Sequence, residues 1–177
     1  MDPAPSTPLP QRQRPAHFPP VESHNRSTLI FVTVCTRDRA PHLAIDLVHR
    51  ALLSAWRQAA HWQVGRYVIM PDHVHFFCSP ELHPPTPLPR WIAYWKRLTT
   101  QLLRLEGPRP RGPHSSATST PPSFHWQRDF WDTQLRSGDS YTEKWHYVRN
   151  NPVRRGLAPS ADLWPFQGEL HHLRWHD

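Results

Sequence analysis

Residues 62–78 read WQVGRYVIMPDHVHFFC, and this stretch decides the fold. Its first part (62–70) and its last part (73–78) are rich in β-branched and aromatic side chains, and Pro71 and Asp72 separate them. Short apolar runs of this kind, bounded by turn-forming residues, are typical of buried strands. The stretch therefore predicts two strands joined by a short turn.

The segments on both sides of this unit predict helices and further strands. Leu52 and Trp56 fall on one face of a helical pattern, and Trp91 and Trp95 do so in a second one. In chain order we expect a strand over 28–36, a helix after Pro41, the strands over 62–70 and 73–78, a helix of about 15 residues ended by Gly107, a short strand over 131–135, and a helix over 139–151 stopped by Pro152. Residues 152–168 look irregular. This order predicts an α+β fold rather than a doubly wound sheet.

The 22 prolines mark the limits of the folded part, because seven lie in 1–20 and five in 108–122. We expect a disordered, Pro-rich leader over 1–25, one domain over 26–168 with a low-complexity loop at 107–123, and a tail over 169–177. A length of 177 residues suits a single domain with a real core. An extended leader that packs on the domain is the open alternative.

Charge and cysteine content narrow the class of protein. The net charge is +7, and 19 of the 21 basic residues are arginines, whose planar guanidinium suits phosphate. A nucleic acid or another polyanion is thus a candidate partner, although a genome that favours Arg codons would give the same composition. Cys35 and Cys78 show no disulfide or zinc spacing, and no apolar run approaches a membrane span. We expect a cytoplasmic protein without a membrane partner.

The sharpest local motif is His73-Val74-His75 within the predicted strand. Side chains two positions apart on a strand point to the same face, so both imidazoles would project side by side. Two imidazoles on a stiff strand form half of a metal site. The competing interpretation is a pair of partly exposed histidines in a chain that has 14 of them.

Tyr147 and Asn151 form a second pair, on the last predicted helix. Positions i and i+4 share a helical face, so a phenol and an amide would be presented together. Tyrosine can act as a covalent nucleophile, and the Asn carbonyl oxygen is a hard metal ligand. Taken alone, Tyr147 is better explained as an amphipathic packing residue and Asn151 as a helix-end residue, and the pair gains value only in combination with the two histidines.

Four segments in order resemble the motifs of the Y1 transposases of the HUH superfamily, and within it the REP-associated tyrosine transposases. They are VIMPDHVHFF, FHWQRDFWDTQLRS, KWHYVRNNPVRRGL and LWPFQG, and the similarity spans residues 28–168. The resemblance implies a ferredoxin-like antiparallel sheet flanked by helices. It also implies cleavage of single-stranded or hairpin DNA through a tyrosine that becomes linked to the 5′-phosphate.

Matched residue by residue, the resemblance makes His73, His75 and Asn151 ligands of Mg²⁺ or Mn²⁺ and Tyr147 the catalytic nucleophile. Asp72 stands where such proteins commonly have Asn or Glu, and we expect it to be a turn residue rather than a ligand. The basic residues that we expect to contact DNA are Arg149, Arg154, Arg155, Arg128 and Arg97.

Two other functions stay open at this point: a DNA-binding protein that keeps the fold without cutting, and an RNA-binding protein. Retention of the two histidines, the tyrosine and the asparagine together disfavours the first, and the absence of an aromatic RNA-binding motif disfavours the second. The oligomeric state, monomer or homodimer, is not decided by the sequence.

Overall fold

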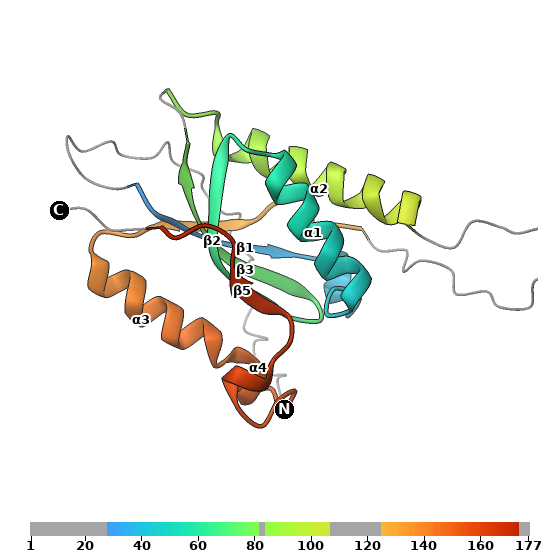
Figure 1. Cartoon of the computed structure of the whole chain (residues 1–177), viewed down its shortest axis with the longest axis vertical. Helices are drawn as coiled ribbons and strands as arrows, with labels where there is room; N and C mark the ends of the chain where they lie inside the picture. Colours follow the sequence, from blue (N-terminus) through green and yellow to red (C-terminus); the bar gives the residue numbers. More distant parts are fainter. Residues whose placement is uncertain (1–27, 82–83, 107–124, 174–177) are drawn as a thin grey trace, which may run out of the picture.

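The computed structural model describes residues 28–81, 84–106 and 125–173. A five-stranded sheet in the order β4-β1-β3-β2-β5 forms its centre, with α1 and α2 on one face and α3 on the other (Figure 1). Every strand pair is antiparallel. The predicted α+β architecture is thus confirmed. The predicted leader (1–25) and loop (107–123) lie outside the described residues.

The strand–turn–strand unit is confirmed and supplies the middle of the sheet. β2 (Trp62–Ile69) runs antiparallel to β3 (His73–Pro80), and the backbone N–H of Met70 donates to the carbonyl of His73 across the turn, at 2.8 Å. β1 (Ile30–Cys35) pairs with the other side of β3. β3 is therefore the central strand, with both edges hydrogen-bonded.

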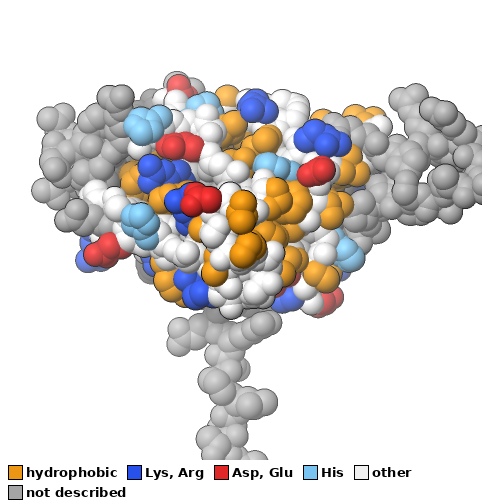
Figure 2. Space-filling model, turned by 60° about the horizontal axis from the view of Figure 1, so that its bottom comes forward, with side chains coloured by type: hydrophobic (Ala, Val, Ile, Leu, Met, Phe, Trp, Pro, Cys, Tyr) orange, Lys and Arg blue, Asp and Glu red, His pale blue; other side chains and the backbone are white. Residues whose placement is uncertain are grey.

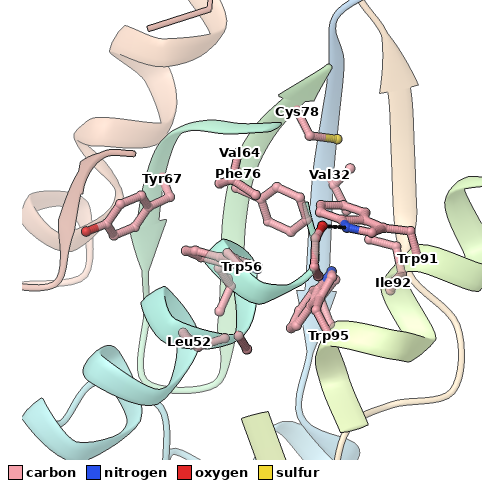
Figure 3. Close-up of a cluster of buried hydrophobic side chains, with 14 of the residues drawn as sticks. Val32, Leu52, Trp56, Val64, Tyr67, Phe76, Cys78, Trp91, Ile92 and Trp95 are labelled. Carbon is pink, nitrogen blue, oxygen red and sulfur yellow. Dashed lines mark hydrogen bonds between the residues drawn. The ribbon is translucent and has the colours of Figure 1, made fainter. Parts of the chain in front are cut away.

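The larger part of the core lies between the sheet and two helices, α1 (Asp46–Gln58) and α2 (Leu88–Glu106) (Figure 3). Phe76 of β3 is fully buried there, with its ring centroid 5.5 Å from that of Trp56 and 5.8 Å from that of Trp95. The apolar faces predicted for both helices are confirmed, since Leu52 and Trp91 are also buried.

The opposite face of the sheet is covered by α3 (Gly138–Arg149), and its core is smaller. Phe77 of β3 packs edge-on against Tyr141, with ring centroids 4.7 Å apart. Val148 near the end of α3 packs with Trp164, whose indole N–H donates to the carbonyl of Ile69 at 3.0 Å. The short strand predicted at 131–135 is also confirmed as β4 (Trp131–Gln134), which pairs with β1.

The prediction of one helix over 139–151 is wrong at its end. α3 ends at Arg149, and a separate short helix, α4 (Asn151–Arg154), begins after Asn150. Proline has no N–H to donate to the carbonyl four residues back, but it is well suited to the first turn of a new helix. Pro152 therefore opens α4 instead of stopping α3.

The prediction that residues 152–168 are irregular is also wrong. Besides α4, this segment holds a 3₁₀ turn, η2 (Ala161–Leu163), and most of β5 (Gln167–Glu169), which pairs with β2. A Cβ on Gly168 would lie 2.7 Å from the hydroxyl of Tyr67, so a larger residue would force the Tyr67 ring or β5 to shift. The fold continues past residue 168, because Leu173 is buried in the core beneath α3.

Cys35 and Cys78 are both fully buried, on β1 and β3. In the part of the chain that the structure describes, no helix is long and apolar enough to cross a membrane.

Candidate metal and nucleic-acid site

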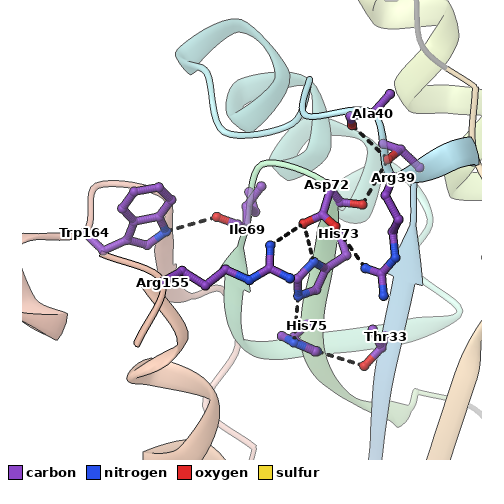
Figure 4. Close-up of polar contacts among 10 residues, drawn as sticks. Thr33, Arg39, Ala40, Ile69, Asp72, His73, His75, Arg155 and Trp164 are labelled. Carbon is purple, nitrogen blue, oxygen red and sulfur yellow. Dashed lines mark hydrogen bonds and ion pairs between the residues drawn. The ribbon is translucent and has the colours of Figure 1, made fainter. Parts of the chain in front are cut away.

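The two histidines of the HxH motif project from the same face of β3, as predicted. Val74 and Phe76 alternate with them and are fully buried on the α1–α2 side. The His75 ring stacks on Phe31, at 5.4 Å between centroids, on the α3 side. The pair thus lies on the face of the sheet opposite α1 and α2, next to Asp72 and Thr33 (Figure 4).

Both imidazoles are held by hydrogen bonds at Nδ1, and their Nε2 atoms face each other at 3.0 Å. Nδ1 of His73 donates to Asp72 Oδ1 at 2.7 Å, which leaves a lone pair on Nε2 of a neutral ring. Nδ1 of His75 lies 2.8 Å from Thr33 Oγ1, a hydroxyl that can either accept or donate. The contact between the two Nε2 atoms is itself a hydrogen bond, in which Nε2 of His75 donates to Nε2 of His73 while Thr33 donates to Nδ1 of His75. If the His75 proton moves to Nδ1 and Thr33 accepts a hydrogen bond from it instead, both Nε2 lone pairs become free for one bound cation.

Burial keeps both rings neutral. It lowers the pKa of His75 to about 3, helped by the neighbouring His73 and Arg39. It also lowers the pKa of His73, because the loss of solvent outweighs the opposing attraction of Asp72. A neutral imidazole is the form that binds metal, so no proton has to leave at neutral pH.

Asp72 is more than the turn residue predicted from the sequence. Its side chain is 10% exposed and also binds Arg155 through Oδ1 at 3.0 Å and Arg39 through Oδ2 at 3.1 Å. Burial pulls the pKa of Asp72 upward, but the hydrogen bond from His73 and the nearby positive charges outweigh it and leave the pKa below its usual value. An acidic residue directly before the HxH motif was the signal in the sequence.

Arg39 reaches this site through an unusual turn after β1. Asp38 and Arg39 both have φ of 56°, a left-handed conformation that costs energy for residues other than glycine. Thr36 fixes the turn, because its hydroxyl lies 2.9 Å from the carbonyl of Ala40 and 3.0 Å from that of Asp72. Nothing in the sequence pattern pointed to Arg39.

Tyr147 is exposed, with 62% of its surface accessible. Among the side chains of α3 that the structure describes, Tyr141 and Val148 are the buried ones, so the interpretation of Tyr147 as a packing residue is wrong. The Arg154 guanidinium lies 4.0 Å from the centroid of the Tyr147 ring and donates to the Tyr147 carbonyl at 2.9 Å. The phenol is therefore presented at the surface under a cation.

Asn151 lies in α4, beyond the break that follows Tyr147, and its Oδ1 accepts a hydrogen bond from Arg154. No hydrogen bond joins it to His73 or His75 among the described residues. Within the same residues, no three His, Cys, Asp or Glu side chains are grouped to hold a metal ion. A metal bound by the histidine pair therefore needs another oxygen ligand, and Asn151 stays a prediction in that role.

Only one of the arginines predicted to contact DNA is joined to the histidine site by these contacts: Arg155, through Asp72. Arg149 pairs with Asp162, and Arg97 lies on α2, on the other face of the sheet, above the Tyr94 ring. The carbonyl of Arg128 faces Lys96 of α2. On the face shown in Figure 2, basic side chains are dispersed, several of them beside acidic ones, and form no single basic patch.

The antiparallel sheet with two helices on one face and one on the other is an α+β fold that matches a Y1 transposase. A solved structure described as a REP-associated tyrosine transposase bound to a REP hairpin has this fold: the TM-score is 0.60, with 20% sequence identity over 89% of this chain and 81% of that one. The family resemblance of the sequence is thereby confirmed at the level of the fold.

A second solved structure, a putative transposase from Deinococcus radiodurans, aligns with a TM-score of 0.46 and 16% identity over 70% of this chain and 90% of that one, too weakly to carry an argument. No protein-family model and no curated protein matches the sequence.

Proposed function

We propose that this protein is a metal-dependent endonuclease and transposase that cleaves and rejoins single-stranded DNA through Tyr147, on strands associated with REP-like hairpins. The observation that carries the proposal is the orientation of the histidine pair: two neutral, anchored imidazoles whose Nε2 atoms converge at 3.0 Å. The exposed phenol of Tyr147 supplies the nucleophile that such a site needs.

The histidine pair fits a small divalent cation. Two ligands at right angles on an octahedral ion, each about 2.1 Å from it, are about 3.0 Å apart. Mixed nitrogen and oxygen ligation suits Mn²⁺ and Mg²⁺. When bound, the ion would polarise a non-bridging phosphate oxygen and orient the scissile bond.

Asp72 and Thr33 would act as positioning residues for this ion, because each holds one imidazole at Nδ1 and so fixes which nitrogen faces outward. Asn151 would supply the oxygen ligand that the resemblance assigns to it. Its Oδ1 is bonded to Arg154, so that hydrogen bond must break before Asn151 can bind the ion.

The chemical step is a phosphoryl transfer that needs no ATP. The Tyr147 oxygen would attack the phosphorus, form a new P–O bond and lose its proton to solvent. The bond from phosphorus to the 3′ oxygen breaks, and that oxygen leaves as a 3′-OH after it takes up a proton. Because one phosphodiester replaces another, a 3′-OH on a second strand can reverse the step and rejoin DNA.

The test is incubation with a hairpin-bearing single strand, 5′ or 3′ labelled, in Mn²⁺, followed by a denaturing gel. We expect a protein-linked product on the 5′-phosphate side, absent in Tyr147→Phe and in chelator. Tyr94→Phe is the matched control, because Tyr94 lies on α2 on the opposite face of the sheet, and it should cleave like the unmodified protein.

Cleavage that survives Tyr147→Phe would contradict the choice of nucleophile, and cleavage unaffected by chelator would contradict the metal. Strand binding of normal strength without any cutting would favour the alternative, a DNA-binding or regulatory protein with the same fold.

A further inference from the structure

We infer that Arg39 and Arg155 form a phosphate clamp beside the histidine pair, held by Asp72, which grips the DNA backbone next to the scissile phosphate. This inference rests on the proposed function and names the part of the DNA that this side of the site recognises. It adds Arg39, which the sequence did not indicate, and gives Arg155 a defined partner.

The two arginines converge on one carboxylate from distant parts of the chain. Arg39 follows β1, and Arg155 follows α4, yet each places Nη1 about one hydrogen bond from Asp72, at 3.1 Å and 3.0 Å. The same carboxylate binds His73. Both guanidiniums are therefore fixed relative to the imidazole that faces the proposed metal (Figure 4).

Both guanidiniums keep most of their donors available. Among the described residues, the side-chain hydrogen bond of each goes to Asp72 and uses Nη1 alone, and a guanidinium has five N–H donors. The Arg39 and Arg155 side chains are 49% and 50% exposed, whereas that of Asp72 is 10% exposed. Two accessible cations thus lie above one buried anion, next to neutral histidines, and the excess positive charge faces solvent.

Two arginines are more than the negative charge of Asp72 requires. Arg39 at Oδ2 and His73 at Oδ1 already give each carboxylate oxygen a donor, and Arg155 adds a second positive charge that the single carboxylate does not balance. The Arg39 side also bears the strain of two consecutive residues with positive φ. A planar, bidentate donor pair of this kind suits a phosphodiester, whose two non-bridging oxygens accept hydrogen bonds.

The experiment measures binding of a fluorescent hairpin with a single-stranded extension, by anisotropy, in chelator and over a range of salt. Chelator removes any contribution from the metal. The variants are Arg39→Ala, Arg155→Ala and Arg39→Lys, and the control is Arg37→Ala, an exposed arginine in the same turn. Thermal unfolding of each variant checks that it is folded.

We expect Arg39→Ala and Arg155→Ala each to weaken binding about 3- to 10-fold near 0.1 M salt and to lower the salt slope by about 0.7. Arg39→Lys should keep the slope and lose part of the affinity, since it keeps the charge without the fork. Arg37→Ala should bind like the unmodified protein. Unchanged affinity and slope in both alanine variants would overturn the clamp while leaving the proposed cleavage intact.

A second background separates phosphate binding from support of Asp72. In Asp72→Asn the carboxylate charge is gone, so an arginine that only neutralises it has no further role. We expect Arg39→Ala to weaken binding in this background too, and equal binding with and without Arg39 would overturn the clamp. An unmodified protein that binds no strand would overturn the proposed function itself, together with the clamp.

Discussion

The side chains on the two faces of the sheet differ in their burial and in their contacts, although β3 contributes side chains to both faces. On the α1–α2 face, Phe76 and its neighbours are fully buried and make aromatic contacts. On the α3 face, the aromatic rings are partly covered by cations: Lys144 lies 5.4 Å from the Phe31 ring and Arg66 5.5 Å from that of Trp145. Because the side chains of β3 alternate between the two faces, one strand supplies core residues to one face and the histidine pair to the other.

The largest expected effect comes from a substitution on the α1–α2 face, called the aromatic face below. Phe76→Ala should lower the free energy of unfolding by about 3–5 kcal/mol, because it leaves a cavity among Trp56, Trp91 and Trp95. His75→Ala, one residue away on the other face, should cost less than half as much. Urea unfolding monitored by tryptophan fluorescence measures both. Equal losses would mean that the two faces share the burden of stability.

The aromatic face also contains a buried cation, Lys96, whose ammonium donates to the carbonyl of Gln127 at 3.0 Å. Burial lowers its pKa to about 8, although Asp129 opposes the shift. Between pH 8 and 10.5 the unfolded chain holds a proton that the folded chain has released, so this residue's contribution to stability rises with pH. The contribution of Lys96 to the free energy of unfolding is fully present above pH 10.5 and is lost as the pH falls toward 8.

Relative to Lys96→Met, the unmodified protein should therefore gain up to about 3 kcal/mol in free energy of unfolding between pH 8 and 10.5. Urea titrations of both proteins at several pH values measure the difference, with Lys144→Met on the α3 face as the control for loss of a lysine. A difference that stays constant with pH would contradict the lowered pKa.

The difference between the two faces could be predicted from the sequence where it depends on the spacing of residues within one strand or one helix. The period of two along β3 placed His73 and His75 together, and the apolar stripes of α1 and α2 identified the residues that pack on the other side. These features need only neighbours in the sequence.

The rest depends on contacts between distant segments. The turn that carries Arg39 is held by Thr36 and Asp72, and β5 has three residues that extend a sheet through pairing with β2. The break near Arg149 could be expected from Pro152. The new helix α4 that follows it was not predicted, and Val148 beside the break packs with the distant Trp164. Contacts of this kind, between segments far apart in the chain, cannot be predicted from local sequence pattern.

The proposed metal site on the α3 face is tested by the change in protein stability when Mn²⁺ is added. At a Mn²⁺ concentration about 100 times the dissociation constant, the unmodified protein should gain about 2.7 kcal/mol of stability. His75→Phe keeps the stacking on Phe31 but removes a ligand, and it should gain nothing. Thermal unfolding with and without Mn²⁺ measures this, with the exposed His61→Phe as control. Equal stabilisation of both variants would contradict the histidine site.

The smallest effect concerns the residue that orients His75. Thr33→Val has nearly the same shape but offers no oxygen to Nδ1, so the imidazole is free to present the wrong nitrogen. We expect Mn²⁺ affinity to fall about tenfold, with little change in stability, since a partner outside the ligand set usually contributes at this level. Titration calorimetry measures the affinity, and the exposed Thr133→Val on β4 is the control. If Thr33→Val binds Mn²⁺ as tightly as the control, the stacking of His75 on Phe31 alone orients the ring, and the polar character of this face reduces to the Asp72 side of the pair.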